Sequence, residues 1–128
     1  MNYTNIILFI LCCLFSFFSP AQINSNIVSG DNYFNQGNYA EAELAYLKAK
    51  KEEPANSLPS VKIGMIYIKK REHQTAVKHF NTALQKKQND TLALYYRAFA
   101  LSELKKNKEA IQDLTTLISL TNIWADAY

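Results

Sequence analysis

The side chains that could perform chemistry are few, and their spacing argues against a catalytic or metal site. His73 and His79 are six residues apart, which does not place them on one face of a helix, and no third ligand stands nearby. The chain has no glycine-rich phosphate loop, no nucleophile elbow and no His-Glu metalloprotease helix. Its carboxylates are scattered, as on solvated faces and helix caps. The sequence therefore predicts no enzyme activity, no cofactor and no metal.

Both cysteines, Cys12 and Cys13, lie in an apolar segment near the N-terminus, so the rest of the chain has no thiol for a disulfide or a metal. This segment, residues 6–18, would form a helix about 20 Å long, which is shorter than the ~30 Å hydrocarbon core of a bilayer. The Ser-Pro-Ala sequence of residues 19–21 follows and resembles a cleavage site. We therefore predict that residues 1–21 are a signal peptide that precedes a domain of residues 22–128.

Two alternatives for this leader stay open. Residues 1–5 contain no Lys or Arg, so the leader could be an uncleaved short anchor, which would be the chain's one contact with a membrane. It could also be a lipoprotein signal that uses Cys12 or Cys13, although Leu11 stands where a small residue is expected before Cys12. In each case we expect export, to the periplasm or cell envelope of a bacterium or as a secreted protein. The Asn-, Lys- and Ile-rich composition is compatible with that location.

The charged residues give no indication of nucleic-acid binding. The formal net charge is +3, too small to indicate nucleic-acid binding, and no charged side chain precedes Asp31. Many of the basic residues form four clusters at the C-terminal ends of predicted helices, where the helix dipole favours them. An acidic partner or an anionic head group is the alternative explanation. These clusters are Lys50-Lys51, Lys69-Lys70-Arg71, Lys86-Lys87 and Lys105-Lys106.

The elements that would position any site repeat every 34 residues. Small and aromatic residues recur at this period without insertion or deletion: Gly30 and Gly64, Tyr33 and Tyr67, Ala42 and Ala76, Tyr46 and Phe80, Ala49 and Ala83. The third copy falls on Ala98, Leu101, Ala110, Leu114 and Leu117. A fixed period of this length is typical of stacked helix-turn-helix units. We therefore expect an all-α solenoid with repeats at 23–56, 57–90 and 91–124 and an incomplete fourth at 125–128.

Each repeat is predicted to contain two helices. Their expected ranges are 24–36 and 39–52, 58–70 and 73–86, and 91–104 and 107–120. Gly37 suits the left-handed position that ends the first helix, and Asn38 with Glu41 has the spacing of a capping box. Ser57 and Asp90 are predicted to cap the first helices of the second and third repeats.

The residues that carry the period resemble the tetratricopeptide repeat. The first repeat matches with Gly30, Tyr33, Ala42, Tyr46, Ala49 and Pro54, and the second with Gly64, Tyr67, Ala76, Phe80 and Ala83. The third keeps Ala98 and Ala110 and has leucines at the other core positions, while Gln88 and Asn122 stand in place of the proline. The resemblance covers residues 23 to 128. It implies a right-handed α-α superhelix whose paired helices cross closely at Gly or Ala.

This resemblance also implies a concave groove that is lined by the first helices and holds a peptide or a partner helix. It places the following residues on or near the groove: Ile27, Asp31, Phe34, Leu58, Val61, Met65, Ile68, Leu92, Tyr95 and Phe99, with Lys69 and Glu103 at its rim. Several of the apolar members could instead be ordinary helix packing. As a binding surface, the groove would suit an amphipathic helix or a hydrophobic peptide. Met65, Tyr95 and Phe99 are the preferred anchors.

One subtype of the family grips a C-terminal carboxylate with Lys, Asn and Arg, and the corresponding positions here do not fit it. They hold Ile27, Asp31, Lys62, Leu92 and Tyr96, which include one cation and a carboxylate that would repel the ligand. We therefore expect a non-catalytic protein-interaction scaffold. The alternative is the N-terminal sensory or assembly portion of a longer envelope protein, such as a signalling receptor or an outer-membrane complex subunit.

The last predicted helix would expose Ile111, Leu114, Leu117 and Ile118 at helical spacing, with no complete helix after it. A solenoid needs a polar helix over such a terminal face. Truncation of a longer parent is the favoured explanation, and binding of another copy or of a partner is the alternative.

Overall fold

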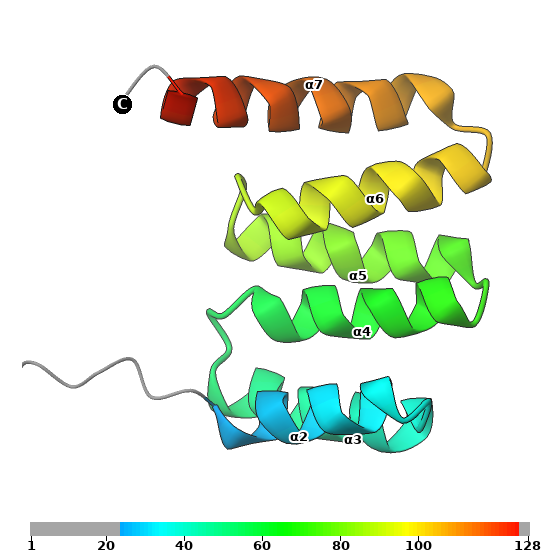
Figure 1. The fold of residues 1–128 in the computed structure, drawn as a ribbon, viewed down its shortest axis with the longest axis vertical. Coiled ribbons are helices and arrows are strands. Elements are labelled where there is room, and N and C mark those ends of the chain that lie inside the picture. The colour runs from blue at the N-terminus through cyan, green and yellow to red at the C-terminus, as the bar shows by residue number, and fades with distance from the viewer. Residues whose placement is uncertain (1–23, 126–128) are drawn as a thin grey trace, which may run out of the picture.

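The computed structural model describes residues 24–125, which form six helices and contain no strand (Figure 1). The helices are α2 (Ser25–Asn35), α3 (Tyr39–Glu52), α4 (Leu58–Lys69), α5 (His73–Lys86), α6 (Thr91–Glu103) and α7 (Asn107–Ala125). Successive pairs form three helix-turn-helix units that stack in chain order, which confirms the predicted all-α solenoid. The predicted signal peptide, with both cysteines, lies outside the described residues, and so does most of the predicted fourth repeat. Both stay predictions.

The helix boundaries follow the prediction closely except at the end of α7. This helix continues to Ala125, although the period places its end at Leu120. Residues 121–124 contain neither Gly nor Pro, and no further helix packs on them within the described part of the chain. No backbone feature therefore stops the helix where the earlier repeats turn.

Glycine at the helix crossings is explained by the aromatic ring that packs against it. A Cβ atom added to Gly30 would lie 2.4 Å from the ring of Tyr46, and one added to Gly64 would lie 2.5 Å from the ring of Phe80. Both rings are fully buried. Because the ring fills the space that a side chain would need, the two helices of the first hairpin and of the second can approach closely only at glycine.

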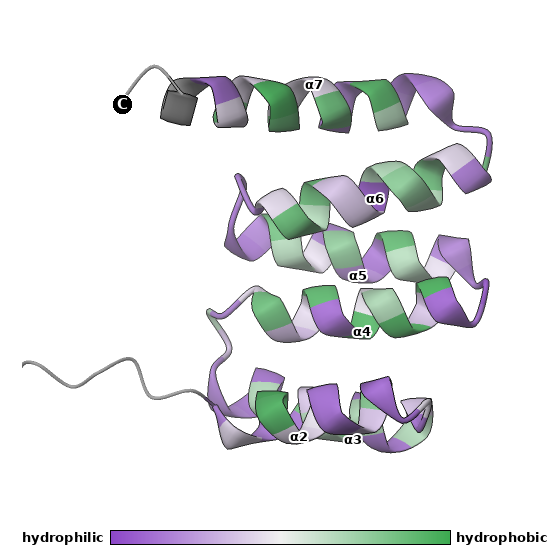
Figure 2. Ribbon diagram, viewed as in Figure 1, coloured by the Kyte–Doolittle hydropathy of each residue, from purple (hydrophilic) through white to green (hydrophobic). Residues whose placement is uncertain are grey.

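The core lies between the helices. Hydrophobic and hydrophilic residues alternate along the helices, as expected when one face is buried (Figure 2). Among the alanines that carry the repeat, Ala42, Ala49, Ala76 and Ala83 are fully buried, and Ala98 and Ala110 are nearly so. The repeat pattern predicts that Tyr33 is a core residue, and this prediction is wrong, since 40% of Tyr33 is exposed. Its counterpart Tyr67 donates a hydrogen bond to Glu43 of the preceding repeat at 2.8 Å. No repeat precedes Tyr33 within the described residues, so it has no such surface to pack on.

Two of the predicted helix ends are confirmed. The Asp90 Oδ1 atom accepts hydrogen bonds from the backbone N–H groups of Leu92 and Ala93, both at 3.1 Å, so Asp90 caps α6. Gly37 has a φ angle of +78°, in the left-handed region that glycine adopts readily. It makes the turn between α2 and α3.

Two other predicted caps are wrong. Asn38 holds the N-cap position of α3, but its side-chain oxygen accepts no hydrogen bond from the helix, and its side-chain N–H donates to Gln36 at 3.3 Å. Ser57 does not cap α4 either; its hydroxyl donates to Asp90 Oδ2 at 2.6 Å and joins the start of α4 to the start of α6. The Asn56 side chain accepts from the first N–H group of α4 in its place. The second and third repeats are thus held together by a buried polar contact.

None of the described helices is both long and apolar enough to cross a membrane.

Candidate functional site

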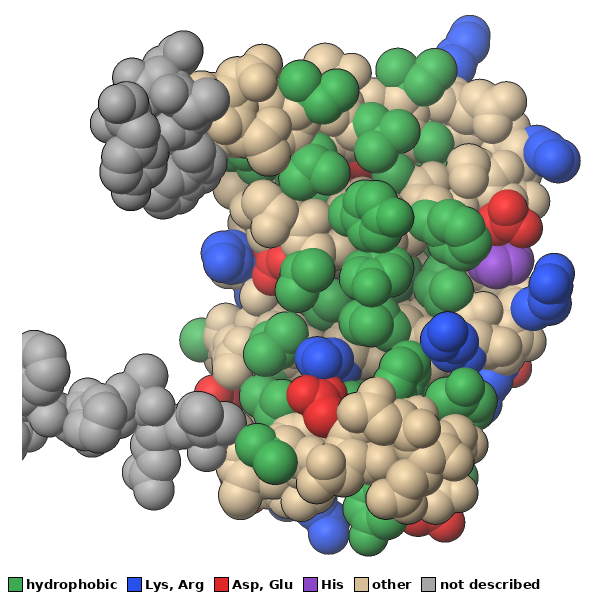
Figure 3. All heavy atoms as spheres, viewed as in Figure 1, with side chains coloured by type: hydrophobic (Ala, Val, Ile, Leu, Met, Phe, Trp, Pro, Cys, Tyr) green, Lys and Arg blue, Asp and Glu red, His purple; other side chains and the backbone are tan. Residues whose placement is uncertain are grey.

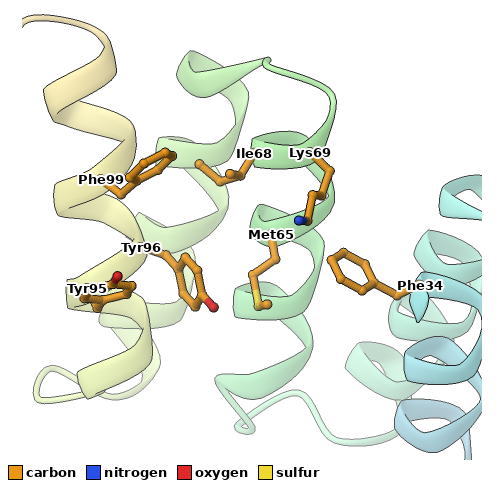
Figure 4. A pocket seen from close by; sticks show the side chains of 7 residues that line it. All are labelled: Phe34, Met65, Ile68, Lys69, Tyr95, Tyr96 and Phe99. Carbon is orange, nitrogen blue, oxygen red and sulfur yellow. The ribbon is translucent and has the colours of Figure 1, made fainter. Parts of the chain in front are cut away.

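An open groove with a volume of about 310 Å³ runs across the first helices of the three hairpins. Its walls come from α2, α4 and α6, and its lining residues are Phe34, Met65, Ile68, Lys69, Tyr95, Tyr96 and Phe99 (Figure 4). Hydrophobic side chains gather over the middle of this face of the molecule (Figure 3). We call this surface the central groove.

Core residues hold the groove's aromatic side chains in place. The Tyr96 ring stacks on the buried ring of Phe80, with ring centres 6.1 Å apart, and Tyr95 meets Tyr96 edge to face at 5.2 Å. On the opposite wall, the Phe34 ring contacts the ring of Tyr39 at the start of α3, at 5.5 Å. The rings are therefore fixed from behind, while their outer surfaces stay available.

The central groove is apolar and open to solvent. Tyr95 is 53% exposed and Phe99 is 44% exposed, and Met65 and Ile68 are half-buried between them and Phe34. Large side chains of this kind dominate the energetics of protein interfaces. A thioether beside them adapts to partners of different shape.

The structure brings together five of the eight predicted groove residues: Phe34, Met65, Ile68, Tyr95 and Phe99. Two predictions are wrong because the side chains belong to the core. Val61 is fully buried in the cluster that contains Ala93 of α6, and only 8% of Ile27 is exposed. Asp31 is partly exposed but lies outside the groove lining, because it bonds to neighbouring side chains.

Tyr96 lines the groove although the list of predicted groove residues left it out; the sequence analysis named it only at a position corresponding to the carboxylate grip. Its counterparts in the other repeats are Val28 and Lys62, so the repeat gives no consistent signal at this position. Lys69, predicted at the rim, does line the groove. Glu103 does not, although it lies close to His73, whose ring meets Phe99 edge-on with centres 6.2 Å apart.

The one cation at the positions corresponding to the carboxylate grip is already paired. Lys62 Nζ lies 2.9 Å from Asp31 Oδ1, and the Tyr46 hydroxyl donates to the same oxygen at 2.6 Å. Burial, together with the bond to Asp31, raises the pKa of Tyr46 far above its ordinary value, so the phenol remains a donor. The Lys62 charge is therefore balanced within the protein. By contrast, Lys69 has no carboxylate within ion-pair distance among the described residues.

The two histidines do not form a joint site. His79 stacks on Tyr67 with ring centres 5.2 Å apart, and burial, followed by the charge of Lys50, lowers the pKa of His79. His73 lies by Glu103 and Phe99. Within residues 24–125, no three histidine, cysteine or carboxylate side chains are grouped so that they could hold a metal ion.

The family comparisons match the tetratricopeptide repeat in three segments, residues 23–56, 61–90 and 92–120. The comparison with curated proteins gave no match. Similar solved structures include the second repeat domain of Spaghetti (RPAP3) bound to the HSP90 peptide SRMEEVD. It is 28% identical with a TM-score of 0.71, and the alignment covers 75% of this chain and 84% of that one.

Two further structures have the same fold. The second repeat domain of human RPAP3, in complex with the HSP70 peptide SGPTIEEVD, is 27% identical with a TM-score of 0.67, over 75% of this chain and 83% of that one. The TPR2B domain of yeast Sti1, in a complex with pHsp70, is 22% identical with a TM-score of 0.69, over 73% and 74% of the two chains. Since the matched segments span most of the sequence, the chain belongs to the tetratricopeptide repeat family.

Proposed function

We propose that this protein is a non-catalytic interaction scaffold that binds an amphipathic helix or a hydrophobic peptide segment in the central groove. The observation that carries the proposal is the aromatic wall of α6, where Tyr95 and Phe99 are about half exposed although their neighbours are packed. The solved relatives hold peptides, which supports a polypeptide ligand for this chain.

The free energy available at this wall is sufficient for a specific contact. Fully burying one large apolar side chain contributes about 1.5–3 kcal/mol, so covering a half-exposed one contributes about half of that. Two anchors and the Met65–Ile68 floor therefore offer several kcal/mol before the entropic cost of association is subtracted. Because the buried Phe80 ring supports Tyr96, which in turn contacts Tyr95, little further ordering of these two rings is needed on binding.

We further propose that the ligand is an internal apolar segment and not an acidic C-terminal tail like those in the relatives' peptides. Asp31 neutralises Lys62, so this pair offers no free positive charge to a carboxylate. Ile27 is buried, and Leu92 offers only an apolar side chain. A terminal carboxylate would lose its hydration at these positions without gaining an unpaired cation.

A binding assay with matched variants tests the groove. The full chain would be screened against an array of amphipathic and hydrophobic peptides, and the best binders measured by fluorescence anisotropy. We expect Phe99→Glu and Met65→Glu to weaken binding at least tenfold, with helicity by circular dichroism unchanged. Leu44→Glu is the matched control, because Leu44 is 61% exposed and lies outside the groove. Binding that survives both groove substitutions would show that the site lies elsewhere.

The peptide SRMEEVD, which the Spaghetti domain binds, tests the ligand class. We expect this peptide to bind more weakly than the array peptides, and we expect Lys62→Ala to leave the array peptides' affinity unchanged. Tight binding of SRMEEVD that depends on Lys62 would instead identify an acidic-tail receptor.

We also propose that the protein is exported, a conclusion that rests on the sequence of residues 1–21 alone. The mass of the chain recovered from an expressing bacterium tests it. A mass that begins at Gln22 indicates cleavage after Ala21, whereas the full-length mass in the cytoplasmic fraction contradicts export.

A further inference from the structure

One charged side chain, Lys69, lies among the apolar residues of the central groove. Of the described residues that line the groove, it alone is charged, and it stands in the last turn of α4. Figure 4 shows that its side chain extends toward Met65 and Phe34. The helix dipole favours a cation at the C-terminal end of α4, wherever its side chain points. The dipole therefore explains the charge of Lys69 but not its place in the groove.

The neighbouring lysines are paired with carboxylates, whereas Lys69 is not. Lys62 Nζ lies 2.9 Å from Asp31 Oδ1, and Lys70 Nζ lies 3.9 Å from Glu43 Oε2. Among residues 24–125, no carboxylate lies within ion-pair distance of Lys69. The charge of Lys69 is therefore available to a ligand.

The charge at this position of the repeat changes sign from α4 to α6. Counted by the 34-residue period, Asn35 of α2 and Glu103 of α6 are the counterparts of Lys69. The Glu103 carboxylate lies outside the groove lining, 3.9 Å from His73 Nε2. At this position, an acidic group of a ligand therefore meets a cation over α4 and a carboxylate over α6. Of the three first helices, α4 is the one that favours it.

The end of the groove at which Lys69 stands has a net positive charge. The turns that follow α4 and α6 lie at the same end of the molecule (Figure 1). Residues 69–72 and 103–109, which form these turns and the helix ends beside them, include six basic and three acidic side chains. The summed field of such a group attracts anions. An acidic side chain is therefore drawn to this end of the groove.

A ligand without a negative charge would cover Lys69 at a cost. An ammonium group that loses its water without gaining a carboxylate is destabilised. A carboxylate at this point replaces the lost water with a charge-assisted hydrogen bond. The apolar surroundings of the groove also screen the pair less than bulk water does.

We propose that the segment bound in the central groove carries an acidic side chain beside its apolar face, and that Lys69 selects this side chain by pairing with it. This selection rests on the function proposed above and adds the charge that the ligand carries. The acidic residue is an internal side chain, and Lys69 is not among the positions that correspond to the carboxylate grip. The apolar face of the ligand covers Tyr95 and Phe99, while its acidic side chain lies over α4.

Matched peptides test the selection. Amphipathic peptides would be synthesised in sets of three that differ only in one residue beside the apolar face, which is Glu, Gln or Lys. Their affinities for the full chain would be measured by fluorescence anisotropy. We expect the Glu peptide of a set to bind about threefold more tightly than the Gln peptide, and the Lys peptide to bind most weakly. This difference should shrink at high salt.

Charge reversal in the protein assigns the selection to one residue. We expect Lys69→Glu to reverse the order, so that the Lys peptide binds most tightly, and Lys69→Gln to remove the preference, with helicity by circular dichroism unchanged. Lys78→Glu is the matched control, because it changes the net charge equally and Lys78 is an exposed residue of α5 outside the groove. It should keep the preference for the Glu peptide.

Two results would overturn the selection and leave the proposed function intact. One is equal affinity for the Glu and Gln peptides while Phe99→Glu still weakens the binding of both, as expected if Lys69 turns into solvent when a ligand binds. The other is a preference for Glu that persists in Lys69→Glu, which would assign it to another cation. If no peptide binds, or if binding is insensitive to Phe99→Glu, the proposed function itself is contradicted, and the selection with it.

Discussion

Gly64→Ala should destabilise the protein although alanine is the better helix former. The added Cβ would lie 2.5 Å from Phe80 Cε1, 2.7 Å from Cζ and 2.9 Å from Cδ1. The Phe80 ring cannot move aside easily, because it is fully buried and stacked on Tyr96. Overpacking of this kind costs about 1–3 kcal/mol. The higher helix propensity of alanine offsets about 1 kcal/mol of this packing cost.

The decisive experiment measures the same substitution beside a smaller neighbour. In the third repeat, the equivalent pair is Ala98 with Leu114, so alanine there accompanies leucine in place of an aromatic ring. We therefore expect Gly64→Ala to change sign in a Phe80→Leu background and to stabilise by about 0.5–1 kcal/mol. The coupling between the two sites should be about 1–3 kcal/mol. Urea unfolding followed by circular dichroism gives the four free energies of the cycle.

Gly37→Ala is the matched control for the cycle. Gly37 also forbids a side chain, but through its φ angle of +78°, with no atom within 4 Å of the added Cβ. Its substitution should cost about 1–2 kcal/mol, equally in both backgrounds. If Gly64→Ala changed the free energy of unfolding by the same amount in the wild-type and Phe80→Leu backgrounds, the steric explanation of the glycine would be refuted.

Two further predictions concern the Arg97–Asp113 ion pair of the third repeat and the protonation of His79. Arg97→Ala should cost about 2–3 kcal/mol in urea unfolding, because it strips two hydrogen bonds, at 2.6 and 2.7 Å, from the nearly buried Asp113 carboxylate. Adding Asp113→Asn should recover part of that loss, and no recovery would argue against a charge effect. Burial lowers the pKa of His79 below its ordinary value of 6.5, so the unfolded chain binds the proton more tightly than the folded chain. The free energy of unfolding should therefore decrease as the pH is lowered below about 6.5. His79→Gln should show a smaller loss between pH 7.5 and 5.5, and an unchanged loss would assign the dependence to other groups.

The groove could be predicted only in part from the sequence, and Val61 and Met65 show why. Both are apolar, and they stand four residues apart on one face of α4. Val61 is fully buried in a cluster with Ala93 of α6, whereas Met65 lines the groove. A helical pattern identifies an apolar face, but where a neighbouring helix covers that face depends on how the hairpins stack.

The sequence by itself determined the repeat architecture, because the close approach of paired helices admits only small residues at fixed positions and so imposes a 34-residue period. Only the tertiary structure decided which apolar side chains are left for a partner. Tyr96 joins the groove because Phe80 of α5 supports its ring, and Lys62 is neutralised because Asp31 lies on the neighbouring repeat. Contacts between repeats depend on pairs of positions that differ from copy to copy, and the period carries no information about them.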